Sequence, residues 1–153
     1  MMTTTMMSKL RRSLVLHEDL VNHPYKDTLG NVTAGVGYNI TARGLPEKWI
    51  NSKITIPDDL IYAQLQDDIT YFYDQLSSFD WYQQLTPDRQ IVLIDMAFMG
   101  WKKFLTFDKM INAISIGDYN QAAFEMLNSE WAEQVKQRAT DLAQGMLTGS
   151  YNV

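Results

Sequence analysis

The first helical pattern of the chain begins near Ser8. Leu10 and Leu14 lie four residues apart, and Ser8 is of a residue type that caps helix starts. One more step of four residues reaches Glu18. The pattern therefore predicts a helix from Ser8 to about Leu20, with both leucines and Glu18 on the same buried face.

Farther along, the pattern changes to strict alternation within Tyr25–Tyr38. The residues after the turn-like TLGN alternate between apolar and small or polar types, with Thr33, Gly35 and Gly37 on one face. We predict a β-hairpin here. The stretch KITI at Lys53–Ile56 is a candidate third strand.

Two longer helices are predicted after this hairpin. Pro57 and Asp58 open the first, and its apolar residues recur at intervals of three and four: Ile61, Leu65, Ile69, Phe72 and Leu76. Thr86 and Pro87 cap and start the second, which is apolar on nearly all sides and therefore central to a helical part. Shorter helices follow, and their ends are marked by Gly100, Gly117, Asp118 and Gly149.

These elements predict an α+β fold, in which a long helix joins a small β-hairpin lobe to a larger helical lobe. A chain of 153 residues suits one compact domain. We expect the β-containing lobe at about 18–57, the connecting helix at about 58–79, and the helical lobe at 8–17 together with 80–153. A cleft between the lobes is the expected binding place.

Composition excludes several classes of function. The chain has no cysteine and only two histidines, His17 and His23, so we expect no metal site and no disulfide. A formal charge of −5 with scattered basic residues argues against nucleic acid as a partner. The N-terminal stretch lacks the pattern of a signal peptide, and no window resembles a membrane span, so we expect a cytoplasmic site of synthesis and no membrane insertion.

Glu18 is the first candidate for chemistry. It follows Leu14 by four residues, so it should project from the face that holds the helix to the core. A carboxyl group against apolar surface resists ionisation, as a general acid must near neutral pH. The alternative interpretation is that the helix frays before Glu18 and that its side chain is solvated.

Asp27 and Thr33 lie on facing strands of the predicted hairpin. Glycine weakens a strand, so Gly35 and Gly37 beside Thr33 suggest that something large approaches the backbone, as a sugar chain would. This leaves a carboxylate and a hydroxyl at the edge of an open shelf. Ordinary roles are an Asx turn for Asp27 and strand formation for Thr33.

A protonated acid on a helix and an ionised acid on a nearby strand form the pair used to cleave glycosidic bonds. A separation of about 6.5 to 9.5 Å would leave room for a water molecule and invert the anomeric centre. A threonine hydroxyl beside that water would orient it. No cofactor is needed for this reaction.

The segment HEDLVNHPYKDTLGNVTAGVGY resembles the catalytic segment of the phage-type lysozymes, the endolysin muramidases of glycoside hydrolase family 24. In it, eight residues separate Glu18 from Asp27 and five separate Asp27 from Thr33. Further stretches resemble the helical lobe of that family: DRQIVLIDMAFMGWKKF, AISIGDYNQAAFEMLNSEWAEQVKQRA and LTGSY. The likeness runs from about Leu10 to Tyr151.

The resemblance implies hydrolysis of the β-1,4 bond between N-acetylmuramic acid and N-acetylglucosamine in peptidoglycan. Glu18 would be the general acid, Asp27 the carboxylate that activates the water, and Thr33 the hydroxyl that orients it. Arg138 matches an arginine that pairs with the catalytic glutamate. Phe98 matches an aromatic residue of the cleft, although core packing is an equal alternative for its ring.

Two positions depart from the family pattern. Tyr38 stands where many relatives have histidine, which affects a structural ion pair rather than the catalytic residues. Asn39 falls at a cleft-lining position where an apolar residue is usual, so it is a weaker candidate for substrate binding. The acidic pI of about 4.9 also removes long-range attraction to an anionic cell wall.

The sequence thus predicts a monomeric muramidase that acts on peptidoglycan for host-cell lysis, with a separate holin or delivery system to reach the wall. Two alternatives stay open. One is a lytic transglycosylase, which cuts the same bond with mainly one acid. The other is a non-catalytic peptidoglycan-binding module that has kept the fold.

Overall fold

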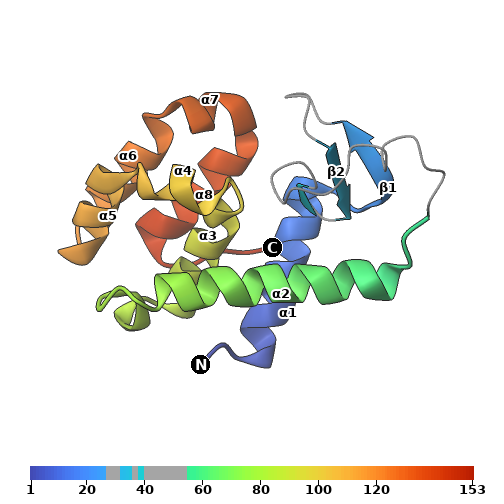
Figure 1. Cartoon of the computed structure of the whole chain (residues 1–153). Helices are drawn as coiled ribbons and strands as arrows, with labels where there is room; N and C mark the ends of the chain where they lie inside the picture. The colour runs from blue at the N-terminus through green and yellow to red at the C-terminus, as the bar shows by residue number, and fades with distance from the viewer. Residues whose placement is uncertain (27–31, 36–37, 40–54) are drawn as a thin grey trace. The chain divides into compact units, whose positions relative to one another are not determined.

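The computed structural model describes residues 1–26, 32–35, 38–39 and 55–153. The chain forms two compact units (Figure 1). The strand unit consists of Arg11–Thr70, and the helical unit consists of Met1–Leu10 together with Tyr71–Val153. The unit boundaries fall within two helices, α1 (Thr4–Glu18) and α2 (Asp58–Leu76).

Helix α1 begins earlier than predicted. Its N-cap is Thr3, whose Oγ1 accepts a hydrogen bond of 3.1 Å from the backbone N–H of Met6. The prediction that Ser8 caps this helix is therefore wrong, because the threonines before it cap and continue the helix. At the other end, Asp19 adopts a φ of 57° and donates its N–H to Val15 O at 3.1 Å, which ends the helix directly after Glu18.

Three short antiparallel strands lie in the strand unit in the order β1 (Val21–Lys26), β2 (Val32–Gly35) and β3 (Tyr38–Asn39). The pairing of β1 with β2 covers part of the predicted hairpin. The predicted strand through Tyr38 is wrong, since β2 ends at Gly35 and Tyr38 starts β3. Of the candidate strand KITI, Thr55 and Ile56 lie outside any strand, and Lys53 and Ile54 lie outside the described residues.

The conformation of Gly35 explains why β2 ends at this residue. Its φ is +63°, which glycine adopts readily and other residues rarely do. A Cβ atom at Gly35 would lie 3.4 Å from Cγ2 of Ile61 in α2. The inference that a sugar chain approaches this face of the strand is therefore wrong at Gly35, because the close neighbour is α2 itself. Gly37 lies outside the described residues.

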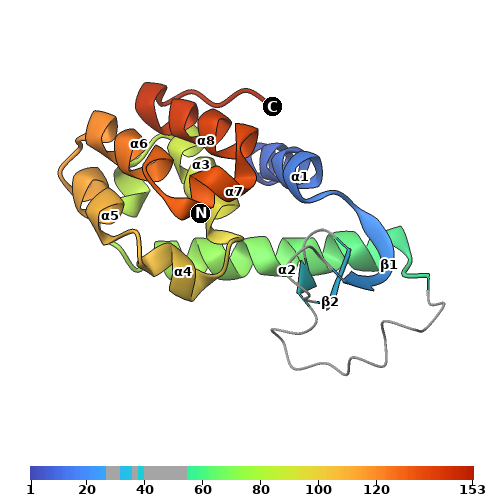
Figure 2. The same ribbon diagram turned by 90° about the horizontal axis from the view of Figure 1, so that it is seen from above.

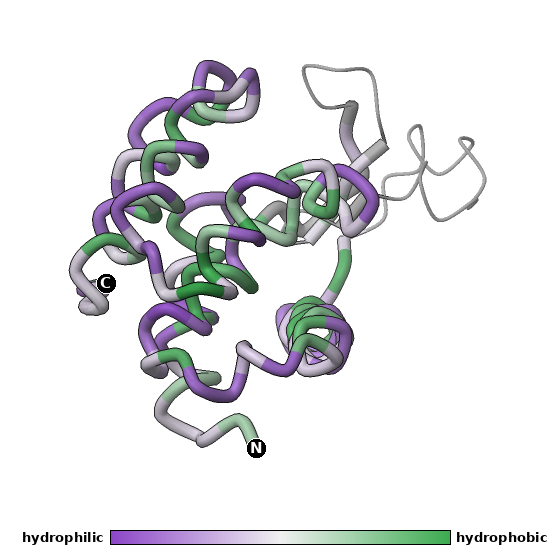
Figure 3. The backbone as a smooth tube through the Cα atoms, turned by 90° about the vertical axis from the view of Figure 1, so that its left-hand side faces the viewer, coloured by the Kyte–Doolittle hydropathy of each residue, from purple (hydrophilic) through white to green (hydrophobic). Residues whose placement is uncertain are grey.

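The predicted long helix is confirmed as α2, and four residues of its apolar stripe are buried: Ile61, Leu65, Ile69 and Leu76. Figure 3 views α2 nearly along its axis and shows apolar and polar residues on the same turns. The predicted second helix is confirmed as α3 (Pro87–Ala97), in which Thr86 Oγ1 accepts from the N–H of Arg89. Every residue from Gln90 to Ala97 is buried.

The remaining helical unit is built around α3. A 3-10 turn (Tyr82–Gln84) precedes α3, and five helices follow: α4 (Trp101–Leu105), α5 (Asp108–Ser115), α6 (Tyr119–Leu127), α7 (Glu130–Val135) and α8 (Gln137–Thr148). Gly100 and Asp118 lie at the N-caps of α4 and α6, and Gly149 ends α8 in a left-handed conformation, as predicted. Helix α8 packs against both α3 and α6 (Figure 2).

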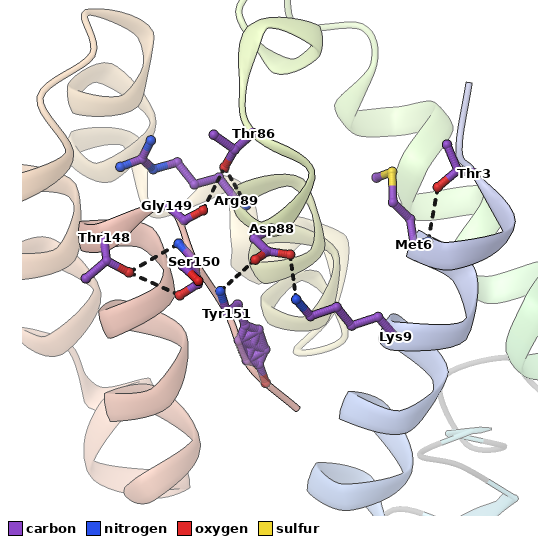
Figure 4. Close-up of polar contacts among 10 residues, drawn as sticks. All are labelled: Thr3, Met6, Lys9, Thr86, Asp88, Arg89, Thr148, Gly149, Ser150 and Tyr151. Carbon is purple, nitrogen blue, oxygen red and sulfur yellow. Dashed lines mark hydrogen bonds and ion pairs between the residues drawn. The ribbon is translucent and has the colours of Figure 1, made fainter.

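The start of α3 joins three parts of the helical unit (Figure 4). Asp88 accepts from Lys9 Nζ at 2.7 Å and from the backbone N–H of Tyr151 at 2.8 Å. Its neighbour Arg89 donates to Met146 O and Leu147 O in the last turn of α8. The first turn of α3 is thus bonded to α1 and to the segment that follows α8.

Candidate active site

Glu18 is the last residue of α1 and is partly exposed. The alternative that the helix frays before it does not hold, because α1 is regular up to this position. The left-handed Asp19 then turns the chain toward β1. The carboxyl group is therefore fixed at a helix end, where it combines partial burial with access to solvent.

Thr33 occupies the central strand of the sheet. Its register partners are Tyr25 in β1 and Asn39 in β3, and only 5% of its surface is exposed. The predicted open shelf is therefore wrong for Thr33, because the residue is buried and does not lie on an exposed edge. Asp27 lies outside the described residues, as does the segment that joins β1 to β2. Pairing with Thr33 places Asn39 directly beside it.

Phe98 follows α3 directly and belongs to a group of aromatic side chains in the helical unit. Its ring centroid lies 5.0 Å from that of Phe72, and the ring of Phe72 lies 6.5 Å from that of Trp101. Trp101 in turn contacts Phe79 and stacks on Phe104. Phe98 and Trp101 are both partly exposed, so neither residue is fully enclosed by the core.

Arg138 lies in the first turn of α8 and contacts Asp95 of α3. Its Nε and Nη2 each lie 2.9 Å from Asp95 Oδ1, and Nη2 also donates to the backbone O of Asp95 at 3.0 Å. The Asp95 side chain has 0% exposure and that of Arg138 has 12%. A carboxylate buried among apolar residues requires a hydrogen-bonding or cationic partner, and Arg138 supplies both kinds of contact to Asp95.

The structure thus groups the predicted residues in two sets. In the helical unit, Arg138 contacts Asp95 of α3, and Phe98 follows Asp95 by three residues at the C-cap of that helix. In the strand unit, Thr33 and Asn39 are register partners. Glu18 belongs to the strand unit as well. The predicted pairing of Arg138 with Glu18 joins residues of different units and stays a prediction.

Sequence reasoning missed one functional contact of this region. In the sequence Asp95 is a single charged residue among apolar neighbours, and the structure shows that it binds Arg138. The two residues are 43 positions apart, and no local spacing links them. The available signal was the cost of burying a single carboxylate, which requires a cationic or hydrogen-bonding partner.

A separate pocket of about 280 Å³ lies in the helical unit between α5 and the α6–α7 turn. Lys109, Glu125 and Ser129 line it, and Trp131 and Phe107 contribute an aromatic wall with ring centroids 6.1 Å apart. None of the predicted site residues of the described chain lines this pocket. Trp131 is 3% exposed and is therefore chiefly a core residue.

Among the residues that the structure describes, no three His, Cys, Asp or Glu side chains gather closely enough to hold a metal ion. Likewise, none of the described helices has the length and apolar character needed to cross a bilayer.

Comparison with known proteins gives one informative likeness. No family model matches the chain. The chain is 28% identical over 168 aligned residues to a protein of Dictyostelium discoideum described as "Probable T4-type lysozyme 1". The alignment covers 96% of this chain and 98% of that protein. Because it spans almost the whole of both chains, this likeness supports a lysozyme-like relationship for the protein.

Proposed function

We propose that the protein is a muramidase that hydrolyses the β-1,4 bond between N-acetylmuramic acid and N-acetylglucosamine in bacterial peptidoglycan. The observation that carries this proposal is the likeness to a T4-type lysozyme over nearly the full length of both chains. The spacing of Glu18, Asp27 and Thr33 supports it independently, since it resembles the catalytic segment of the phage-type lysozymes. Glycoside hydrolase family 24 is the proposed family.

The proposed reaction inverts the anomeric centre. Glu18 donates its proton to the glycosidic oxygen as the bond from the anomeric carbon to that oxygen breaks. Water attacks the anomeric carbon from the opposite face and gives a proton to Asp27, while Thr33 orients the water. This requires about 6.5 to 9.5 Å between the two carboxyl groups. No metal or organic cofactor takes part.

Three further residues complete the proposed site. Phe98 provides an apolar surface for a sugar ring, which suits its partial exposure at the end of α3. Asn39 contacts substrate beside Thr33. Arg138 pairs with Glu18 and holds it in place. The biological role that we propose is host-cell lysis by a monomeric endolysin, made in the cytoplasm and passed to the wall by a separate holin or delivery system.

Clearing of outer-membrane-permeabilised bacteria by wild-type protein and by Glu18→Gln and Asp27→Asn tests this function. Loss of the general acid should lower the rate by roughly 10²- to 10⁴-fold. Asp19→Asn is the matched control, because Asp19 is an exposed neighbour of Glu18 and asparagine also tolerates the left-handed conformation. Wild-type clearing by Glu18→Gln would contradict the catalytic role and favour the non-catalytic binding module.

End-group analysis of the released fragments separates the two enzyme candidates. A hydrolase leaves reducing N-acetylmuramic acid ends, whereas a lytic transglycosylase closes a 1,6-anhydro ring. We expect reducing ends, because both Asp27 and Thr33 are present to use a water molecule. Detection of 1,6-anhydro ends would contradict hydrolysis and show that the protein is a lytic transglycosylase.

A further inference from the structure

Asp95 is the only charged side chain among the buried residues Gln90–Ala97 of α3. Burying a carboxylate without a partner is strongly unfavourable, and the cationic Arg138 offsets this cost. Such a buried pair is weak evidence for stability, since two well-packed apolar residues stabilise a core equally well or better. The pair therefore calls for an explanation other than stability.

The geometry of the pair fixes the orientation of Arg138. Its Nε and Nη2 both lie 2.9 Å from Asp95 Oδ1, and Nη2 also donates to the backbone O of Asp95. Contacts from two nitrogens of a planar guanidinium set its plane and direct one edge toward α3. The position of the remaining nitrogen, Nη1, follows from that plane.

The backbone before Arg138 is held in an unusual conformation. Lys136 joins α7 to α8 with φ 52° and ψ −111°, a region that residues other than glycine rarely occupy. Strain of this kind persists only where the surroundings determine it, and it gathers at functional sites. Here the packing of α8 against α3 and the bonds of Arg138 to Asp95 lie two residues away.

We propose that Asp95 is a positioning residue, which orients the guanidinium of Arg138 for its part in the active site. This inference rests on the proposed function, in which Arg138 acts on the general acid Glu18. It adds that the last turn of α3 and its C-cap supply two parts of the site: Asp95 for the arginine and Phe98 for the sugar.

Steady-state kinetics on solubilised peptidoglycan test the positioning role. We expect Asp95→Ala to lower kcat by roughly 10- to 100-fold with KM nearly unchanged, because a small misplacement of a supporting group acts on the reaction step. Asp95→Asn keeps an oxygen acceptor for Arg138 and should restore most of kcat. If Asp95→Ala does not fold, Asp95→Ser replaces it, since its hydroxyl cannot reach both nitrogens of the guanidinium.

Asp88→Asn is the matched control, because Asp88 lies on α3 like Asp95 and also forms an ion pair, in its case with Lys9 of α1. It should lower the thermal midpoint and leave kcat within about twofold at a temperature well below that midpoint. Wild-type kcat in a folded Asp95→Ala or Asp95→Ser variant would overturn the inference. An equal loss of kcat in Asp95→Asn and Asp95→Ala would also overturn it.

A second measurement separates this inference from the proposed function. The Nε–H signal of Arg138 in ¹H–¹⁵N spectra, assigned by its absence in Arg138→Lys, should be protected from solvent exchange in the wild type and lost in Asp95→Ala. If the wild-type protein does not cleave peptidoglycan, the proposed function fails while this signal still reports on the positioning. An Arg138 signal that is unchanged in Asp95→Ala would contradict the positioning itself.

Discussion

Asp19 ends α1 in a left-handed conformation, with φ 57°, directly after the candidate acid Glu18. Glycine adopts this conformation without steric cost, whereas aspartate does not. We expect Asp19→Gly to raise the free energy of unfolding by about 0.5 to 1 kcal/mol. Denaturant unfolding measures this change.

Asp80 provides the control for that substitution. It is also an exposed aspartate in a turn, but it is not among the residues with positive φ. Asp80→Gly should therefore lower the free energy of unfolding slightly, because it adds flexibility to the unfolded chain without relieving strain. A loss of stability in Asp19→Gly equal to that in Asp80→Gly would show that the left-handed conformation carries no cost.

Tyr82 is fully buried, and burial raises its pKa far above the ordinary value. The unfolded chain loses the phenol proton near pH 10, while the folded chain keeps it. The contribution of Tyr82 to the free energy of unfolding should therefore be constant below about pH 10 and fall above it, by up to ~1.4 kcal/mol per pH unit. Unfolding curves from pH 9 to 11 measure the slope.

Tyr82→Phe should reduce this alkaline slope, although it also loses the bond from Tyr82 Oη to Gln90 O. The loss of that bond lowers stability by about 1 kcal/mol at neutral pH. Tyr71→Phe is the control, since Tyr71 is 49% exposed, and its slope should match the wild type. An unchanged slope in Tyr82→Phe would contradict the role of burial.

At the scale of elements, Gly145 sets the distance between α8 and α3. A Cβ atom there would lie 2.8 Å from Val92 Cγ2 and 3.1 Å from Tyr151 Cβ. We expect Gly145→Ala to lower the free energy of unfolding by about 1 to 3 kcal/mol through overpacking. Val92→Ala in the same chain should recover part of the loss, whereas the exposed Gln144→Ala should change little.

The elements that the sequence predicted well are those marked by local chemistry. Thr86 and Pro87 mark the start of α3, and the stripe from Ile61 to Leu76 marks α2, because caps and helical periodicity act over a few residues. The end of β2 was missed. The strand ends because Gly35 adopts a left-handed conformation next to Ile61 of α2. A contact between a strand and a helix distant in sequence leaves no local pattern in the sequence.

The candidate site shows the same division. The spacing from Glu18 to Thr33 could be read from the sequence because it lies within one short segment, and the catalytic roles assigned to it stay predictions. The bond between Asp95 and Arg138 could not be predicted from the sequence, because it joins two helices that are distant along the chain. The burial of Thr33 could not be predicted either, because a strand sequence does not reveal what packs on the face from which this side chain projects.

On the scale of the whole molecule, Asp88 is a point where separate parts of the helical unit meet. It accepts from Lys9 in α1 and from the N–H of Tyr151 beyond α8 (Figure 4). We expect Asp88→Ala to cost about 1 to 3 kcal/mol, because it leaves the N–H of the buried Tyr151 without its acceptor. Lys9→Ala should cost less than about 1 kcal/mol, since that ion pair is partly exposed.

A double-mutant cycle separates the two contributions of Asp88. Thermal or denaturant unfolding of Lys9→Ala, Asp88→Ala and the double variant gives the coupling energy of the ion pair alone. Most of the loss in Asp88→Ala should persist when Lys9 is already alanine. Equal losses in the two single variants, with full coupling, would show that the bond to Tyr151 contributes nothing.

The division of the helical unit between Met1–Leu10 and Tyr71–Val153 has a consequence for synthesis on the ribosome. Residues 11–70 emerge as one continuous stretch and can collapse while translation proceeds, as domains generally do. The helical unit can complete its fold only later. Asp88 and Arg89 bond to partners within residues 146–151, and these bonds form only after that stretch has left the exit tunnel. Until then the first turns of α1 and the apolar α3 belong to an incomplete nascent chain, which chaperones would recognise.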